Sequence, residues 1–516
     1  MSDDQTLRMT APATAAPRRR PRLPARTLTA LAAGSVLAGC AVQPVPMTSD
    51  EARAALAEQR SVMFADQPAL EAPLTLEEAA ARTLKYNLDH RVKLMEQALS
   101  QRQLDLASFD LLPKLAADAG YSWRSNERAS SSRDLVTGEQ SLVPSTSSER
   151  VHDTAGLTLS WNVLDFGVSY YGAKQQADRV LVMRERRRKV VHQLMQQLRQ
   201  AYWQAVGAQQ VEGKIQPLLE MTRSALADSR RIEREKLLPP LEALNYQRQL
   251  LELVRQLEAV RDELAQAKPR LAAMMNVAPS LPFTLAAPEA LPLPRLAVEP
   301  AAMEETALLQ RPEMVEAGYQ ERISLLETKK ALARVLPGVS IELGAQYDND
   351  SYLVNNSWRE TGLRVSWNLL NLLNYGNIRD AAQAQHEIAR QQRLALSMAV
   401  LTQVHIAYRD LQGRQRQYEL ADELNQVDQG ILEHTRNAAA ASAQGQLAAI
   451  RAQAGAVMSE LRLYQSYGAL QNAYGQMLMT LGQDPLPDTL PAHDLATLRA
   501  AFAERERQAQ PAQKQP

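Results

Sequence analysis

Few side chains of this sequence are spaced for chemistry. The seven histidines are scattered without the spacing of metal ligands; they are His90, His152, His192, His386, His405, His434 and His493. The single cysteine, Cys40, excludes a disulfide framework and a zinc site built from cysteines. The sequence contains neither a phosphate-binding loop nor a nucleophile elbow, and its many carboxylates fall on amphipathic helical patterns, typical of a solvated face. It therefore predicts a protein that is not an enzyme and that uses no cofactor and no metal.

Cys40 is the one residue whose surroundings predict a reaction. Five arginines between Arg18 and Arg26 precede a short apolar segment, residues 27–36, and then Leu37-Ala38-Gly39-Cys40, which resembles a bacterial lipobox. In such a motif a peptidase cleaves before the cysteine, whose thiol then carries diacylglycerol. We predict that residues 1–39 are a signal peptide and that mature Cys40 carries diacylglycerol and palmitate. The alternative is an ordinary cleavage site with an incidental cysteine.

Composition excludes several classes of protein. The 516 residues include 58 Lys and Arg and 58 Asp and Glu, so the formal net charge is zero, unlike that of a basic nucleic-acid binder. No run of 18 or more apolar residues occurs, which excludes a membrane-spanning helix. Alanine, Leu, Gln, Glu and Arg dominate, a mixture typical of long helices.

An internal repeat organises the rest of the chain. The segment Gly156-Leu-Thr-Leu-Ser-Trp-Asn-Val-Leu returns as Gly362-Leu-Arg-Val-Ser-Trp-Asn-Leu-Leu, at an offset of 206 residues. Pro279 and Pro485 keep this offset, whereas upstream segments are related by 224 residues, so the first copy holds a longer loop. A duplicated module of roughly 200 residues is far longer than a solenoid repeat.

Each copy is predicted to contain a helix, two strands, a long helix and a last helix. The helices are expected over 76–110, 168–236 and 241–275, and over 303–335, 377–443 and 447–481, with a kink or end at Pro269. A helix of roughly 70 residues is about 100 Å long. Apolar residues at heptad spacing favour supercoiled packing; examples are Leu194, Leu198 and Ala205 in the first copy and Ile450, Val457 and Leu461 in the second.

The strands are predicted at about 114–123, 155–163, 339–347 and 362–369. Each alternates apolar and polar residues over about ten positions, a length that suits tilted strands across a bilayer. Small residues are expected to face inward; they are Gly120, Ser122, Gly156, Ser160, Gly344, Gly362 and Ser366. Aromatic residues near the strand ends suit contact with the membrane interface; they are Tyr121, Trp123, Trp161, Tyr347 and Trp367.

These repeats resemble the outer-membrane efflux proteins of the TolC family. Trp161-Asn-Val-Leu-Asp-Phe-Gly167 is similar to the family's strand-to-helix signature, and Leu308-Leu-Gln-Arg-Pro-Glu313 resembles its opening-helix motif. The resemblance covers about residues 70–490. It implies a mainly α protein with a small β part, in which two tandem helix–β-hairpin–long helix–helix repeats form a trimeric helical barrel. That barrel is continuous with a twelve-stranded transmembrane β-barrel, four strands from each chain.

The resemblance also implies a function and a set of partners. It implies the outer-membrane channel of a tripartite efflux or type I secretion system, a passive duct joined to a periplasmic adaptor and an inner-membrane pump. The channel would be a homotrimer, lipid-anchored and inserted in the outer membrane and extending into the periplasm, with no nucleic-acid partner. The adaptor would meet the helix breaks opposite the strands; the residues expected there are Lys236, Pro239, Pro240, Glu242, Gln444, Gly445 and Gln446.

The expected organisation follows from the repeat. After the signal peptide (1–39) we expect an anchor and belt segment (40–73), a first repeat (74–282), a Pro-rich connector (283–302), a second repeat (303–487) and a polar tail (488–516). A different class stays open: a lipid-anchored periplasmic coiled-coil adaptor or scaffold, which would not need lipid-facing strands. An outer-membrane enzyme is a distant third.

Overall fold

The computed structural model describes residues 44–141, 143–235, 239–288, 291–296, 298–439, 443–487 and 490–509. The predicted signal peptide and Cys40 lie outside these residues. The chain divides into two units, Met1–Ala65 and Asp66–Pro516. In the first, helix α2 (Ser49–Met63) starts with a capping box between Thr48 and Glu51. Across the described residues, none of the helices combines the length and the apolar character needed to cross a membrane.

The second unit holds both repeats. Elements of the first repeat are α3 (Leu76–Tyr86), α4 (Leu88–Phe109), β1 (Lys114–Trp123), β2 (Ala129–Ser130), β3 (Ser145–Thr146), β4 (Val151–Asn162), α5 (Val163–Arg234), α6 (Pro240–Leu264) and α7 (Ala267–Met274). Those of the second are η1 (Pro300–Ala302), α8 (Met303–Gln310), α9 (Pro312–Ala333), β5 (Gly338–Asp348), β6 (Ser357–Ser366), α10 (Leu369–Leu373), α11 (Tyr375–Ala439) and α12 (Ala443–Leu481), followed by α13 (Leu495–Ala509). The predicted order of elements in each copy is confirmed.

Two predicted helices are interrupted. The helix expected over 76–110 breaks at Asn87, whose ψ of 127° leaves the helical region and whose side chain accepts a hydrogen bond from the backbone N–H of His90. The helix expected over 303–335 breaks in the same way at Arg311, with ψ 128°, ahead of Pro312. Since an offset of 224 relates Asn87 to Arg311, the duplicated module repeats this break.

The predicted kink at Pro269 is wrong by a few residues. The helix ends at Leu264, and Pro269 lies in the first turn of α7. Backbone N–H groups in a first turn have no acceptor within the helix, so a proline there costs no helical hydrogen bond. A proline that the prediction did not consider, Pro217, lies inside α5 instead. Its side chain is exposed, so the helix continues past it with the opposite face packed.

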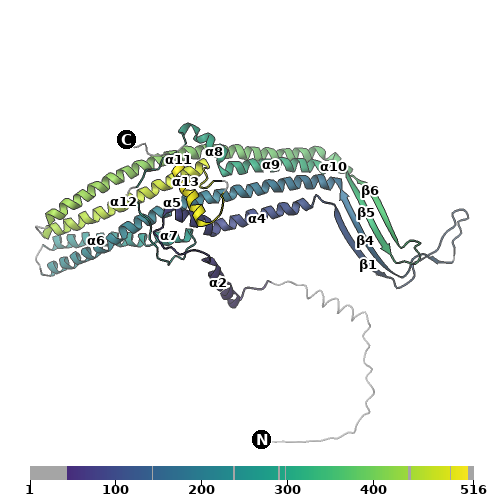
Figure 1. Cartoon of the computed structure of the whole chain (residues 1–516), viewed down its shortest axis with the longest axis horizontal. Coiled ribbons are helices and arrows are strands. Elements are labelled where there is room, and N and C mark those ends of the chain that lie inside the picture. The colour runs from purple at the N-terminus through teal and green to yellow at the C-terminus, as the bar shows by residue number, and fades with distance from the viewer. Residues whose placement is uncertain are drawn as a thin grey trace, which may run out of the picture. The chain divides into compact units, whose positions relative to one another are not determined.

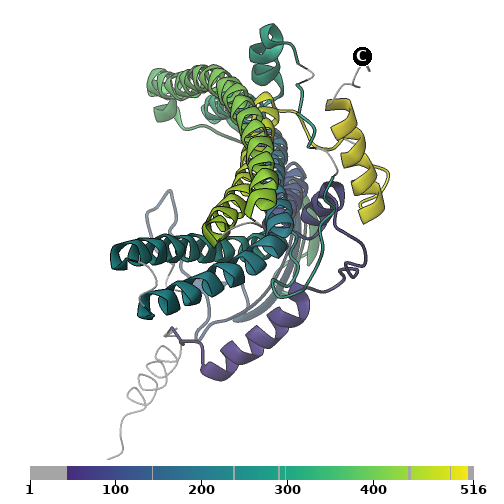
Figure 2. The ribbon, with the colours of Figure 1, turned by 90° about the vertical axis from the view of Figure 1, so that its left-hand side faces the viewer.

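The helices of the second unit form one curved layer. Near the sheet, the neighbours in order are α4, α5, α9 and α11. Farther from the sheet, the order is α6, α5, α12 and α11 (Figure 1). Figure 2, which looks along the helices, shows that the layer is bent into an arc. The long helices α5 and α11 run through both halves, so α4 and α6 form one edge of the layer and α11 forms the other.

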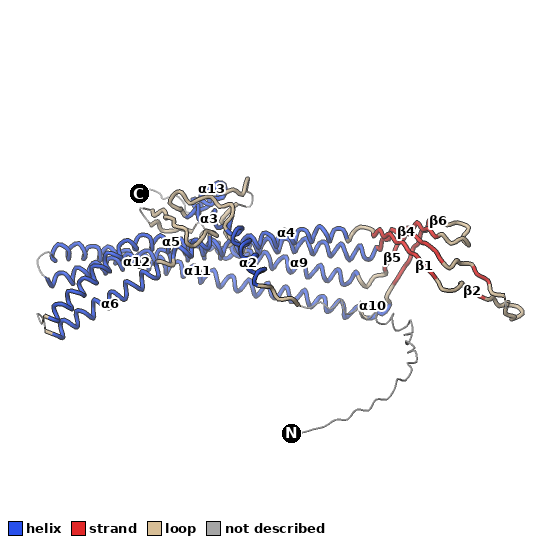
Figure 3. Tube along the Cα trace, turned by 90° about the horizontal axis from the view of Figure 1, so that it is seen from below, coloured by secondary structure: helices blue, strands red, loops and turns tan. Residues whose placement is uncertain are grey.

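The four main strands form an antiparallel sheet at one end of this layer (Figure 3). Their order is β1, β4, β5, β6, so β1 and β6 are the edge strands. The two repeats meet in the middle, where Leu159 pairs with Leu343. The longer first loop carries β2 and β3, which pair with each other.

The core lies along α5 and α12. Most of the predicted heptad residues are buried there, including Leu198, Ile450 and Leu461. Helix α5 approaches α12 closely because Gly207 has no side chain: a Cβ atom at Gly207 would lie 2.6 Å from the Cβ of Tyr464. Two extended segments, around Leu74 and Leu285, pair with each other and cover the middle of α5, where the Tyr202 hydroxyl donates to the carbonyl oxygen of Ala286 at 2.9 Å.

Each repeat ends its last helix in the same way. Asn276 and Gly482, related by the offset of 206, have φ values of 56° and 73°. The next amide donates to a carbonyl five residues back in both copies, from Val277 to Ala272 and from Gln483 to Leu478. These are Schellman-type helix ends. The duplication therefore extends to the backbone conformation.

Candidate functional site

One face of the sheet is apolar. The register aligns apolar side chains across the strands in rows such as Leu115, Leu159 and Leu343, and Trp161, Ile341 and Leu363. Polar residues interrupt this face at Asp153 on β4 and at Ser357, Arg359 and Thr361 on β6. Most of these side chains are exposed, and β1 and β6 are exposed along their whole length. A contiguous apolar face of this kind marks contact with lipid or protein.

The opposite face is polar, but it is more crowded than its glycines suggest. A Cβ atom at Gly156 would lie 2.6 Å from side-chain oxygens of both Asp118 and Gln346. A Cβ atom at Gly344 would lie 2.9 Å from the Cγ of Glu360. Large polar side chains from neighbouring strands thus cover the glycines. The expectation of an inward face made of small residues therefore needs correction: the glycines make room for carboxylates and amides.

The five aromatic residues predicted to face the membrane are all exposed; they are Tyr121, Trp123, Trp161, Tyr347 and Trp367. Trp161 packs edge-on against Phe166 where β4 enters α5, with ring centroids 5.8 Å apart. Trp367 lies just after β6, where its indole N–H donates to the carbonyl of Val335 at 3.0 Å. Another aromatic residue, Trp358, lies on the polar face beside Gln346.

Both edges of the helical layer carry exposed apolar residues at heptad spacing. On the α4 and α6 edge these are Leu88, Val92, Met95, Leu99 and Leu106, and Leu241, Leu244 and Leu251. On the α11 edge they include Leu420, Leu424, Val427 and Ile431. Steps of three and four residues are the spacing at which helices pack on one another. The helical edges and the sheet edges lie on the same sides of the unit, because α4 leads into β1 and β6 leads into α11.

The two helix breaks that were predicted to meet an adaptor lie at the end of the layer opposite the sheet (Figure 1). There, Pro239 and Pro240 begin α6, and they and Glu242 are exposed. Lys236 lies outside the described residues. Gln444, Gly445 and Gln446 belong to the first turn of α12, and their side chains are not described. The structure thus brings the start of α6 and the start of α12 to one end (Figure 1).

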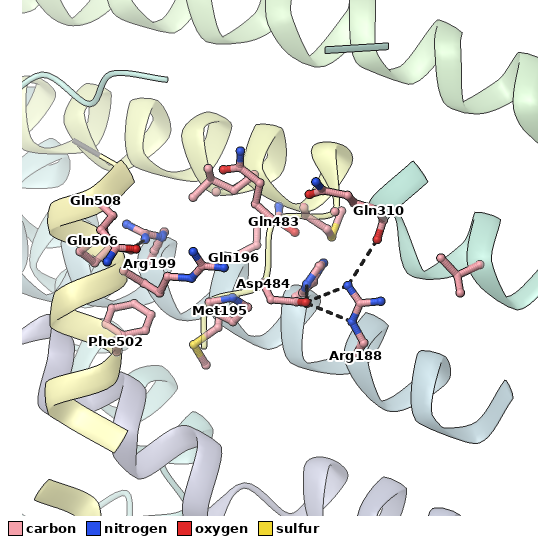
Figure 4. Close-up of a pocket in the computed structure, with 18 of the residues that line it drawn as sticks. Arg188, Met195, Gln196, Arg199, Gln310, Gln483, Asp484, Phe502, Glu506 and Gln508 are labelled. Atoms are coloured by element: carbon pink, nitrogen blue, oxygen red, sulfur yellow. Dashed lines mark hydrogen bonds and ion pairs between the residues drawn. The ribbon is translucent and has the colours of Figure 1, made fainter. Parts of the chain in front are cut away.

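A partly buried ion cluster joins the middle of α5 to the segment after α12 (Figure 4). Arg188 Nη2 donates to Asp484 at 2.8 Å, and the ring Nε2 of His192 lies 2.7 Å from the same carboxylate. Burial opposes ionisation of Asp484, but the hydrogen bonds from His192 and Arg188 outweigh it and lower the pKa of this carboxyl group. Arg188 also pairs with Glu185.

A second buried pair holds α13 on α5. The guanidinium of Arg199 pairs with Glu506 and lies 5.4 Å from the ring centre of Tyr474. Burial raises the pKa of the Tyr474 hydroxyl to about 12. Sequence reasoning missed both ion clusters, which join residues about 300 positions apart. The one signal in the sequence is a difference between the repeats, because Leu394, Met398 and Ala278 occupy the places of Arg188, His192 and Asp484.

Within the described ranges, no group of three or more His, Cys, Asp and Glu side chains is placed to hold a metal ion. The arrangement is instead an amphipathic sheet that continues into a curved helical layer, with unpaired edges on both sides.

Solved structures of bacterial channels share this fold. The chain is similar to the CmeC outer membrane channel of Campylobacter jejuni, with a TM-score of 0.61 and 12% identity over 88% of this chain and 95% of that one. The outer-membrane channel OprN gives a TM-score of 0.60 and 18% identity, over 79% and 89% of the two chains. The MtrE outer membrane channel of Neisseria gonorrhoeae, in its open state, gives 0.57 and 16%, over 79% and 90%. No family model and no curated protein sequence matches the chain. The chain therefore has the fold of these outer-membrane channels.

Proposed function

We propose that this chain is a subunit of an outer-membrane export channel of the TolC type, a passive duct from the periplasm to the outside. The fold it shares with outer-membrane channels supports this function. The observation that carries it is the coincidence of three features in one unit: an apolar sheet face, two unpaired sheet edges and two apolar helical edges. A soluble scaffold or adaptor would not be expected to expose the apolar face of a sheet to water.

We propose that the working unit is a trimer. Unpaired strand edges are not tolerated in hydrocarbon, so a four-stranded sheet must find partners before it can span a bilayer. Two copies would give eight strands, whose interior side chains just fill, whereas three copies give twelve and begin to leave a passage. The same head-to-tail contact would bring the α11 edge of one copy onto the α4 and α6 edge of the next.

We also propose that the end opposite the sheet is the periplasmic mouth. The starts of α6 and α12 lie there together (Figure 1), so three copies would present six similar helix pairs to a periplasmic adaptor. An inner-membrane pump would then drive export through the passive duct. Glu242 is exposed at this end, which supports its predicted contact with the adaptor.

The test is oligomeric state together with conductance. We expect native mass spectrometry of the detergent-extracted protein to give a trimer, and the same sample to form ion-conducting pores in planar bilayers. The scaffold alternative predicts extraction without detergent once the lipid is removed, and no pores. A monomer or dimer that conducts would contradict the shared barrel, and a trimer without conductance would contradict the duct.

We propose further that the mature chain is anchored by a lipid on Cys40. Mass spectrometry of the purified protein is expected to show a chain that begins at Cys40 and carries diacylglycerol. Cys40→Ala is expected to abolish the modification but to leave the protein in the membrane fraction if the signal is still cleaved, because strands would hold it there. An unmodified Cys40 in the mature chain would refute the anchor.

A further inference from the structure

A row of aromatic side chains runs from the sheet onto the first turns of α5. The ring of Trp161, on β4, lies edge-on to Phe166 with centroids 5.8 Å apart, and Phe166 stacks on Tyr170 at 6.5 Å. Lys174 follows, with its Nζ 4.5 Å from the centre of the Tyr170 ring. Positions 166, 170 and 174 recur every four residues, so they share one face of α5. We call Trp161, Phe166, Tyr170 and Lys174 the junction cluster.

The junction cluster is open to its surroundings. Its aromatic side chains are between 38% and 42% exposed, and Lys174 is exposed as well. Within the part of the chain that the structure describes, Lys174 forms no ion pair, and its contact is with the Tyr170 ring. Exposed rings that follow one another on a single face do not contribute to the core, and they indicate contact with another molecule.

Another copy of the chain does not cover the junction cluster in the proposed trimer. The strand β4 is central in the sheet, between β1 and β5. Near the sheet, α5 lies between α4 and α9 (Figure 1). Copies would join instead through β1 and β6 and through the helical edges formed by α4, α6 and α11. The junction cluster therefore stays exposed after assembly.

The position of the junction cluster matches the periplasmic boundary of a bilayer. The strand β4 has 12 residues. At about 3.3 Å per residue and a tilt of about 40°, it rises about 30 Å, which is the thickness of the hydrocarbon core. Helix α5 begins at the next residue, Val163, so its first turns lie at the headgroup layer, which is about 5–7 Å thick. Trp161 lies in one row with Ile341 and Leu363, so the junction cluster continues the apolar sheet face that would contact lipid.

The direction of α5 brings the charge of Lys174 to the same level. Side chains of an α-helix tilt toward its N-terminus, and the N-terminus of α5 is at the sheet. The Cα atom of Lys174 lies about 6 Å beyond that of Tyr170 along the helix. Its ammonium group nevertheless lies over the Tyr170 ring, one turn closer to the sheet. Lysine side chains near a membrane extend in this way to keep their charge among the headgroups.

We propose that the junction cluster is a binding site for an anionic phospholipid of the periplasmic leaflet. The Lys174 ammonium pairs with the headgroup phosphate, and the rings of Phe166 and Trp161 contact the glycerol and the upper part of an acyl chain. Charge complementarity favours a lipid with a net negative headgroup, because lysines near the membrane surface attract anionic lipids. This inference rests on the proposed function, since it requires the sheet to span the membrane.

The experiment is native mass spectrometry of the full-length, detergent-extracted protein with added phosphatidylglycerol or phosphatidylcholine. The parent protein is expected to bind phosphatidylglycerol more tightly than phosphatidylcholine. Lys174→Gln is expected to weaken phosphatidylglycerol binding about fivefold, the size expected for one lysine near an anionic lipid surface, and to leave phosphatidylcholine binding unchanged. Lys174→Arg keeps the charge and is expected to bind both lipids like the parent.

The matched control is Lys189→Gln. Lys189 is a partly exposed lysine of the same helix. It lies about 22 Å farther from the sheet than Lys174, beyond the reach of the headgroups. This variant is expected to bind phosphatidylglycerol like the parent. An equal loss of binding in Lys189→Gln, or unchanged binding in Lys174→Gln, would overturn the proposal.

Two other occupants are distinguished in the same experiment. Displacement of the lipid by excess glycerol phosphate would reveal a site for a free anion, and a protein that copurifies with the parent but not with Lys174→Gln would reveal a protein partner; either result would overturn the proposal. Conductance in planar bilayers is measured on the same samples. A conducting trimer without the lipid preference refutes the lipid site alone, whereas a trimer without conductance refutes the channel function.

Discussion

Aspartate in place of Leu251 or of Val427 is expected to prevent the trimer from forming while leaving the chain folded. Leu251 is exposed on α6 at one edge of the helical layer, and Val427 is exposed on α11 at the other. Each lies about 17 Å along its helix from the helix end that is opposite the sheet. In the proposed head-to-tail contact the two residues therefore lie at the same level along the helix axes. A carboxylate buried there without a partner costs about 3 kcal/mol or more at each of the three interfaces.

The measurement is native mass spectrometry of the detergent-extracted variants, with circular dichroism to confirm that helix content is kept. Met221→Asp is the control, because Met221 is also an exposed apolar residue but belongs to the central helix α5. It is expected to stay trimeric. Trimers of the Leu251→Asp and Val427→Asp variants as stable as those of the parent would place the subunit contact elsewhere.

Gly482→Ala is expected to have the largest effect on folding of any glycine substitution in α12 or at its end. Gly482 has a φ of 73°, which L residues rarely adopt, and its Cβ atom would lie 2.5 Å from the backbone nitrogen of Arg311. The obstacle is backbone rather than the end of a side chain, so the junction of α8 and α9 would have to move. Strain and overlap together are expected to cost about 3 kcal/mol of unfolding free energy.

Thermal unfolding followed by circular dichroism checks this expectation. The control is Gly455→Ala, since Gly455 lies inside α12 and nothing would contact its Cβ atom. That change is expected to be neutral or to stabilise the helix by up to about 1 kcal/mol. Equal melting temperatures for the two variants would show that the close contact between Gly482 and Arg311 does not hold the repeat together.

The sequence by itself determined the elements and their order. Strand periodicity predicted all four main strands, because alternation of side chains between two faces is a local property of an extended chain. The ends differ by up to five residues, since β6 runs from Ser357 to Ser366 and not over 362–369. Heptad spacing likewise predicted which faces of α5 and α12 are buried. The repeat, visible as Gly156 and Gly362 at an offset of 206, predicted that each element has a counterpart.

The tertiary structure decided which distant side chains meet. The break at Asn87 interrupts a continuous helical pattern and has a distant partner, since the Asn87 amide donates to the carbonyl of Met274 at 3.1 Å. The break at Arg311 has a local cause in the sequence, because Arg311 precedes Pro312. The crowding of Gly156 by Asp118 and Gln346 depends on the register of three strands. The contacts of Asp484 with Arg188 and His192 join residues about 300 positions apart, a distance over which no periodicity of the sequence carries information. Local pattern therefore determined the helices and strands of this protein, and long-range packing decided the contacts between distant side chains and which helices and strands form the two open edges.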